Sequence, residues 1–93
     1  MLVMIGYASV HGSTEGIARR LADRLRAYGH SVDVRPLDKP MDALVLYDAF
    51  ILGSAVHGGS WLRQATGFAE REAEILSRRP VWLFSVEIGR AHV

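Results

Sequence analysis

The stretch LVMIGYASVHGSTEGIARR, residues Leu2–Arg20, contains the transition that decides the fold class. Its first seven residues, Leu2–Ala8, form a continuous apolar run that is too short for a typical helix but suits a strand buried on both faces. Beyond the junction, apolar residues recur at helical spacing from Ile17 to Tyr28 with arginines between them, which predicts an amphipathic helix. The chain therefore begins with a strand that passes directly into a helix.

The next segments have clear boundaries. We expect Ser13 or Thr14 to cap the start of the first helix, and Gly29 to end it. Alternation in SVDVRP, residues 31–36, predicts a short second strand, and the proline at its end places that strand near a sheet edge. Residues 37–48 are predicted to be a connection with one turn of helix.

The second half of the chain repeats the pattern of strand and helix. AFILGSA, Ala49–Ala55, is predicted to be a third buried strand, followed by a helix from about Ser60 to Ser77. PVWLFSV, residues 80–86, is predicted to be a fourth strand buried on both faces, with Trp82 and Phe84 in the core. Alternation of this kind predicts an α/β fold with a parallel sheet and helices on both faces.

Composition narrows the function classes. The chain has 93 residues, enough for one domain at most, and its 49% hydrophobic and 23% charged residues are ordinary for a globular protein. A net charge of +1 gives no support for nucleic-acid binding. The absence of cysteine excludes thiolate and Cys-metal chemistry and fits a cytoplasmic location. We expect no metal site and no membrane span, since no apolar run reaches about 20 residues.

The junction between the first strand and helix allows two interpretations. Unpaired amides at a helix N-terminus, together with the hydroxyls of Ser9, Ser13 and Thr14, would bind a phosphate without any lysine or arginine. Alternatively, a hydroxyl only caps the helix and Gly12 only permits the turn. The loop lacks the Gly-Lys-Ser/Thr ending of a P-loop and the three glycines of a dinucleotide-binding fold, so neither of those classes is indicated.

Four motifs together resemble one family. YASVHGSTEGIA (7–18), GHSVDV (29–34), YDAFILGSAVHGGSW (47–61) and PVWLFS (80–85) are similar to the flavodoxin-like family, in particular the small flavodoxin-domain proteins that include menaquinone-dependent protoporphyrinogen oxidases. The resemblance covers Met1 to about Val86. It implies a three-layer, doubly wound parallel sheet in strand order 2-1-3-4, and it implies FMN as the cofactor.

The resemblance also implies a set of cofactor-binding residues. The first loop would hold the ribityl phosphate of FMN, and the loop Ala55–Gly59 with Trp61 would flank the isoalloxazine ring. His57 would stack on the ring or titrate beside it, although an exposed loop histidine is an equal alternative, and Trp61 is alternatively a packing residue. The residues implied are Ser9, His11, Gly12, Ser13, Thr14, Ala55, Val56, His57, Gly58 and Trp61.

Two function classes follow from the resemblance. The first is an FMN-dependent oxidoreductase that passes electrons between a quinone or another carrier and an organic substrate, for example protoporphyrinogen. The second is a non-catalytic electron carrier or flavin-binding module that docks onto a redox partner protein. The near-neutral charge favours the enzyme, because a carrier often has an acidic docking surface. Catalytic residues, substrate and oligomeric state stay open.

The C-terminal stretch EIGRAHV, residues Glu87–Val93, suggests a boundary. Its last six residues match one reading frame of a common short-read sequencing adapter, in which a stop codon follows. We therefore expect residues 1–86 to be the N-terminal part of a flavodoxin-like domain truncated after its fourth strand, and residues 87–93 to be a non-native tail. Because the loop after the fourth strand supplies one wall of the flavin site in the family, we expect weak or absent FMN binding by the 93-residue chain and much tighter binding by the product of the complete gene.

Overall fold

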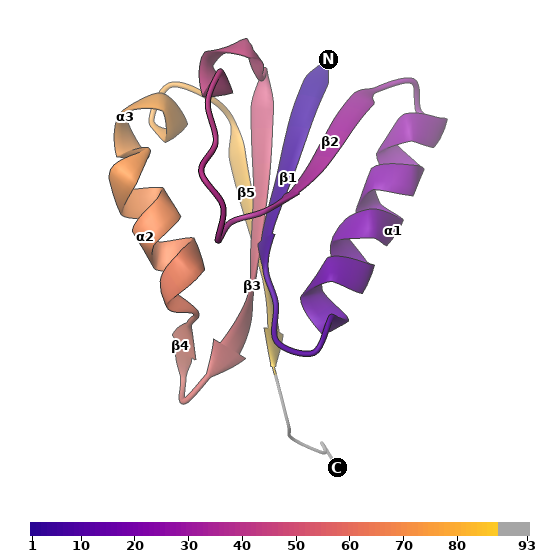
Figure 1. Ribbon diagram of the computed structural model, residues 1–93. Coiled ribbons are helices and arrows are strands. Elements are labelled where there is room, and N and C mark those ends of the chain that lie inside the picture. Colours follow the sequence, from indigo (N-terminus) through magenta and orange to yellow (C-terminus); the bar gives the residue numbers. More distant parts are fainter. Residues whose placement is uncertain (88–93) are drawn as a thin grey trace.

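The computed structural model of the chain describes residues 1–87 (Figure 1). Its helices and strands alternate as the sequence predicts, with one additional short strand. In chain order the elements are β1 (Leu2–Ala8), α1 (Ser13–Ala27), β2 (Ser31–Pro36), the 3-10 turn η1 (Leu44–Leu46), β3 (Ala49–His57), β4 (Ser60–Trp61), α2 (Arg63–Arg71), α3 (Ala73–Leu76) and β5 (Val81–Glu87).

The four long strands form a parallel sheet in the order β2-β1-β3-β5. Their register sets Val3 beside both Val32 and Ala49, and Phe50 beside Val81. The short β4 pairs antiparallel with the end of β3. The predicted strand order 2-1-3-4 is confirmed, with β5 as its fourth strand.

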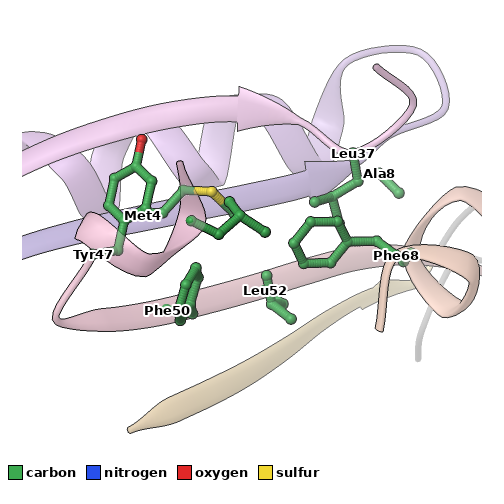
Figure 2. Packing of buried hydrophobic residues seen from close by; sticks show 9 residues of the cluster. Met4, Ala8, Leu37, Tyr47, Phe50, Leu52 and Phe68 are labelled. Carbon is green, nitrogen blue, oxygen red and sulfur yellow. The ribbon is translucent and has the colours of Figure 1, made fainter. Parts of the chain in front are cut away.

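Helices cover both faces of the sheet, which gives three layers (Figure 1). Because successive side chains of a strand point to opposite faces, β1 contributes to two separate cores. Its odd-numbered residues pack with Ala18 and Ala22 of α1, whereas Met4 and Ala8 pack on the other side with Phe68 of α2. Figure 2 shows the second cluster, in which Phe68 lies near Leu37, Ala8 and Leu52.

The boundaries of α1 differ in part from the prediction. Gly12, with φ 83°, is the N-cap, and no side chain in the described part of the chain caps the helix, so the predicted capping role of Ser13 or Thr14 is wrong. At the other end, Gly29 adopts φ 93°; its amide donates to Arg26 O at 2.9 Å, while the His30 amide donates to Leu25 O at 3.1 Å. These two bonds form a Schellman motif, and the predicted stop at Gly29 is confirmed.

The single helix predicted from Ser60 to Ser77 is also wrong. Ser60 and Trp61 belong to β4, because β3 continues through His57 and folds back through a two-residue turn. The helical part is then divided into α2 and α3 at Glu72, whose φ of −106° departs from helical geometry. The predicted loop Ala55–Gly59 is therefore mainly strand, with only its two glycines in the turn.

Strand β5 lies at the edge of the sheet and is largely uncovered. Trp82 is 55% exposed and Leu83 is 65% exposed, so the prediction that Trp82 is a core residue and that this strand is buried on both faces is wrong. Phe84 is half-buried and packs against the cluster under α1. Sequence hydrophobicity does not reveal how far a helix reaches across a sheet: α1 lies mainly over β2 and β1, and α2 lies over β1 and β3.

Two further predictions concern the C-terminal tail and a membrane span. Glu87 pairs in register with Val56, and the remainder of the predicted tail, residues 88–93, lies outside the described residues. Among residues 1–87, no helix combines the length and apolar character that crossing a membrane requires.

The glycines at positions 53 and 67 should respond oppositely to alanine. A Cβ on Gly53 would lie 2.0 Å from Cζ of Phe84, so we expect Gly53→Ala to destabilise the fold by about 1–3 kcal/mol. Gly67, within α2, has open space at the same position, so Gly67→Ala should stabilise by roughly 0.5–1 kcal/mol. Denaturant unfolding of both variants measures the difference, and two changes of the same sign would contradict the packing described for β5.

Candidate functional site

Two loops lie at the same end of the sheet, where the parallel strands have their carboxyl ends (Figure 1). One is the β1–α1 loop, residues 9–12, and the other is the β3–β4 hairpin. The strand order reverses between β1 and β3, because β2 lies on the other side of β1. Ligands of open α/β sheets bind at such a reversal, outside the carboxyl ends of the strands.

The β1–α1 loop and the first turn of α1 contain two buried hydroxyls without a hydrogen-bond partner in the described part of the chain. These are Ser9 Oγ and Thr14 Oγ1, and neither has a partner among residues 1–87. Thr14 is fully buried in the first turn of α1. A buried hydroxyl that makes no hydrogen bond costs about 1–3 kcal/mol, so a ligand that bonded both groups would recover that free energy.

The start of α1 adds backbone donors to these hydroxyls. The first intrahelical bond runs from the Gly16 amide to Gly12 O at 3.0 Å, and the amides of Ser13, Thr14 and Glu15 have no acceptor in the described part of the chain. His11 and Gly12 both have positive φ, 60° and 83°, which turns the chain sharply into the helix. His11, Gly12 and Ser13 are exposed at this turn. Free amides at a helix N-terminus favour an anion.

Charged side chains surround the loop. A cavity of about 320 Å³ next to it is lined by Ser9, Gly12, Glu15, Lys39 and Gln64, together with Tyr7, Ala8, Pro36 and Asp38. The Glu15 carboxylate accepts bonds of 2.8 and 3.0 Å from the Arg19 guanidinium, which offsets its charge near the helix N-terminus. Burial, and next the negative charge of Glu15, raise the pKa of Tyr7, so its phenol stays neutral beside the loop.

The β3–β4 hairpin has a two-residue turn. Gly58 and Gly59 have φ of 60° and 83°, and positive φ at both central residues is the requirement of a type I′ turn. Ala55 is buried in β3, Val56 is half-buried, and His57 is exposed at the end of that strand. Glycine at both turn positions is therefore explained by backbone geometry alone.

Two side chains fix the hairpin to the sheet. The Trp61 indole Nε1 donates to Ser85 Oγ at 2.7 Å, so Trp61 connects β4 to the end of β5. Ser54 is fully buried; its Oγ accepts from the Leu62 amide at 3.0 Å and donates to Ala55 O at 2.7 Å. Since Leu62 is the N-cap of α2, Ser54 sets the position at which α2 begins.

The structure divides the predicted site residues into two groups. Ser9 and Gly12 line the cavity beside the β1–α1 loop, with Thr14 and its unpartnered hydroxyl in the same loop and helix turn. His57 and Trp61 line a separate cavity of about 570 Å³ along α2, with Arg63 among its other residues. Ala55, Val56 and Gly58 line neither of these two cavities. No single cavity described here joins both groups.

The sequence analysis did not single out three residues that line the cavity beside the β1–α1 loop. Asp38 and Lys39 follow the end of β2, so their place at the carboxyl edge of the sheet could be inferred from parallel strand order. Gln64 lies in the first turn of α2, on the face of the sheet opposite to α1, and it lines the same cavity. No sequence pattern marks Gln64. Within residues 1–87 no group of three or more His, Asp or Glu is arranged to hold a metal ion.

Comparison with known families agrees with this fold. The profile of the family described as flavodoxin domain matches residues 4–92. The chain therefore belongs to the flavodoxin domain family. No curated protein matches it significantly.

Several solved structures have the same fold. A flavodoxin from the domain Archaea is 15% identical with a TM-score of 0.73, over 98% of this chain and 86% of that one. Oxidised flavodoxin 2 from Bacillus cereus is 24% identical with a TM-score of 0.71, over 100% and 88%. A Fusobacterium nucleatum flavodoxin bound to flavin mononucleotide is 16% identical with a TM-score of 0.76, over 92% and 52%. At these identities the similarity establishes the fold.

Proposed function

We propose that the protein is an electron-transfer flavoprotein of the flavodoxin type that binds FMN. The observation that carries the proposal is the donor set at the start of α1, where Ser9 Oγ, Thr14 Oγ1 and three backbone amides have no hydrogen-bond partner within residues 1–87. A phosphate monoester dianion can accept hydrogen bonds from all of these groups. The Fusobacterium nucleatum flavodoxin of the same fold is bound to flavin mononucleotide.

The donors fit the phosphate better than they fit a carboxylate. A phosphate has three terminal oxygens and about two negative charges, so it can satisfy two hydroxyls and several amides together. Lys39, which lines the adjoining cavity, supplies the cation nearest to this loop among the residues of that cavity. In this proposal Ser9, Ser13 and Thr14 hold the phosphate, while His11 and Gly12 form the turn that exposes the amides.

The proposed contacts with the flavin ring come from the β3–β4 hairpin. His57, Gly58 and Trp61 would flank the flavin ring, with Ala55 and Val56 positioning the hairpin as part of β3. The isoalloxazine ring would accept and release electrons when FMN is bound. The chain would fix the position of the ring through the hairpin, which Ser54 and the Trp61–Ser85 hydrogen bond hold against the sheet.

A narrower form of the proposal is an enzyme that transfers electrons between a quinone and an organic substrate such as protoporphyrinogen. Its support is the net charge of +1, since an acidic docking surface would favour a carrier for a redox partner protein. Mixing the reduced, FMN-loaded chain with a soluble quinone, and separately with an oxidised redox protein, distinguishes the two. Fast oxidation by the quinone alone favours the enzyme.

Titration with FMN and with riboflavin tests the proposed cofactor. The two ligands share the flavin ring and differ in the phosphate, so only FMN can use the donors of the β1–α1 loop. Although we expect weak binding overall, FMN should bind at least about tenfold more tightly than riboflavin, because a hydrogen bond to a charged group is worth about 1.5–3 kcal/mol. Flavin fluorescence reports both affinities, and equal values would contradict the assignment.

A further inference from the structure

A further cavity lies between α2 and the segment that follows β2 (Figure 1). Its volume is about 770 Å³, compared with about 320 and 570 Å³ for the two cavities at the candidate site, and this size is typical of small-molecule sites. Its lining residues all belong to 37–41 or 63–72, so the uncovered edge of β5 takes no part in it. Asp38, Lys39 and Gln64 are shared with the cavity beside the β1–α1 loop.

Part of the lining of this cavity is apolar, and it includes Leu37, Pro40, Met41 and Gly67. Leu37 and Met41 also pack in the core cluster under α2, which fixes their positions. Gly67 is unusual, because glycine inside a helix is less favourable than alanine. Apart from its own helix backbone and chain neighbours, no heavy atom of the described residues lies within 4 Å of the place that its Cβ would occupy. Packing therefore does not require this glycine, and its missing side chain leaves the cavity open along α2.

The charged side chains around the cavity have a positive excess. Three are cationic and two are anionic: Lys39, Arg63, Arg71, Asp38 and Glu72. Glu72 Oε2 lies 3.6 Å from Arg71 Nε, so these two charges offset each other. Lys39 and Arg63 are exposed, and neither makes an ion pair within residues 1–87. An anion in this cavity therefore meets two cations that no other described side chain neutralises, against the single acid Asp38.

We propose that this cavity binds a small aromatic acid, with its ring on the apolar surface along Gly67 and its carboxylate near Arg63 and Lys39. Such a ligand uses both parts of the lining, whereas a neutral ring cannot use the cations and an inorganic anion cannot use the apolar surface. Arg63 and Gly67 also line the cavity that contains His57 and Trp61, so the acid lies beside the proposed contacts with the flavin ring. Only this relation to the flavin rests on the proposed function, because binding of the acid requires no FMN.

Titration of the chain without FMN compares two probes, naphthoate and naphthamide, which share the aromatic rings and differ in charge. Nitrogen–proton correlation spectra give both affinities and show where each probe binds, because an aromatic ring shifts the amides near it. We expect saturable shifts at the amides of Gln64 and Gly67, with naphthoate bound at least about tenfold more tightly than naphthamide. Equal affinities, no binding, or shifts confined to β5 would overturn the proposal. A failure of FMN to bind would leave these results unchanged.

Two pairs of variants test the position of the aromatic acid. Gly67→Leu places a side chain in the cavity and should weaken naphthoate binding at least about tenfold, whereas Gly67→Ala should change it less than about threefold. Both substitutions raise helix propensity, and circular dichroism confirms that both variants are folded.

Arg63→Gln should weaken naphthoate binding about tenfold and leave naphthamide binding unchanged, because only the acid uses the charge of Arg63. Arg78→Gln is the control, because Arg78 is exposed after α3 and lines none of the three cavities named here. Equal effects of the two arginine substitutions, or of the two glycine substitutions, would contradict the site.

Discussion

Thr14→Val is expected to weaken FMN binding about tenfold to a hundredfold while it stabilises the protein without FMN. The substitution replaces a hydroxyl with a methyl group at a fully buried position. With FMN, the variant loses one hydrogen bond to a charged phosphate, worth roughly 1.5–3 kcal/mol. Without FMN it loses a buried group that has no partner in the described residues, so unfolding should require about 1 kcal/mol more.

Thr14→Val should lower the affinity for FMN but raise the stability of the protein without FMN, and these opposite signs distinguish a binding role from a packing role. A residue that acts only in packing would change stability and affinity in the same direction, or would leave affinity unchanged. Ser77→Ala is the control, because Ser77 is exposed after α3, its hydroxyl donates to Glu74 O at 2.7 Å, and it lines neither of the two cavities at the site. It should leave FMN affinity unchanged. Riboflavin affinity should be the same in wild type and Thr14→Val; an equal loss for both flavins would exclude a phosphate role for Thr14.

Phe68→Ala is expected to cost about 3–5 kcal/mol of the free energy of unfolding. Phe68 is the fully buried aromatic side chain of α2, and it packs between that helix and the sheet (Figure 2). Its removal leaves a cavity bordered by Ala8, Leu37 and Leu52 in the same cluster. Since small domains have a total stability of about 5–15 kcal/mol, this one change removes a large share of it.

Equilibrium denaturation followed by circular dichroism measures that loss. Leu46→Ala provides the comparison, because Leu46 is also apolar but 66% exposed. It should change stability by less than about 0.5 kcal/mol. Similar losses in the two variants would show that α2 is not held to the sheet by Phe68. Because α2 begins where Ser54 bonds the Leu62 amide, Phe68→Ala should also loosen the β3–β4 hairpin.

The fold was largely predictable because its signals are local. Apolar runs in β1 and β3, the periodic stripe of α1 and the Gly29 stop are each contained in a short window of sequence. A parallel sheet with helices on both faces follows from the alternation of strands and helices, whereas the strand order was implied by the family resemblance. The position of the β1–α1 loop was predictable for the same reason, since Gly12, Ser13 and Thr14 follow within a few residues of the end of β1. Its phosphate binding stays a prediction.

The remaining errors concern contacts between distant segments. The exposure of Trp82 depends on how far α1 extends over the sheet, which the sequence of β5 does not contain. Trp61 was assigned to a helix because its spacing to later apolar residues is helical, whereas the Gly58–Gly59 turn places it in β4. Ser13 or Thr14 was expected to cap α1, but Gly12 occupies the N-cap, and the Thr14 hydroxyl has no partner within residues 1–87.

The central claim is that the start of α1 binds the phosphate of FMN, and amide NMR during an FMN titration tests it most directly. Nitrogen–proton correlation spectra report each backbone amide separately. We predict the largest changes at the amides of Ser13, Thr14 and Glu15, with downfield shifts as they donate to the phosphate, and smaller changes in the β3–β4 hairpin. Changes confined to the hairpin or to α2, with these three amides unaffected, would contradict the account.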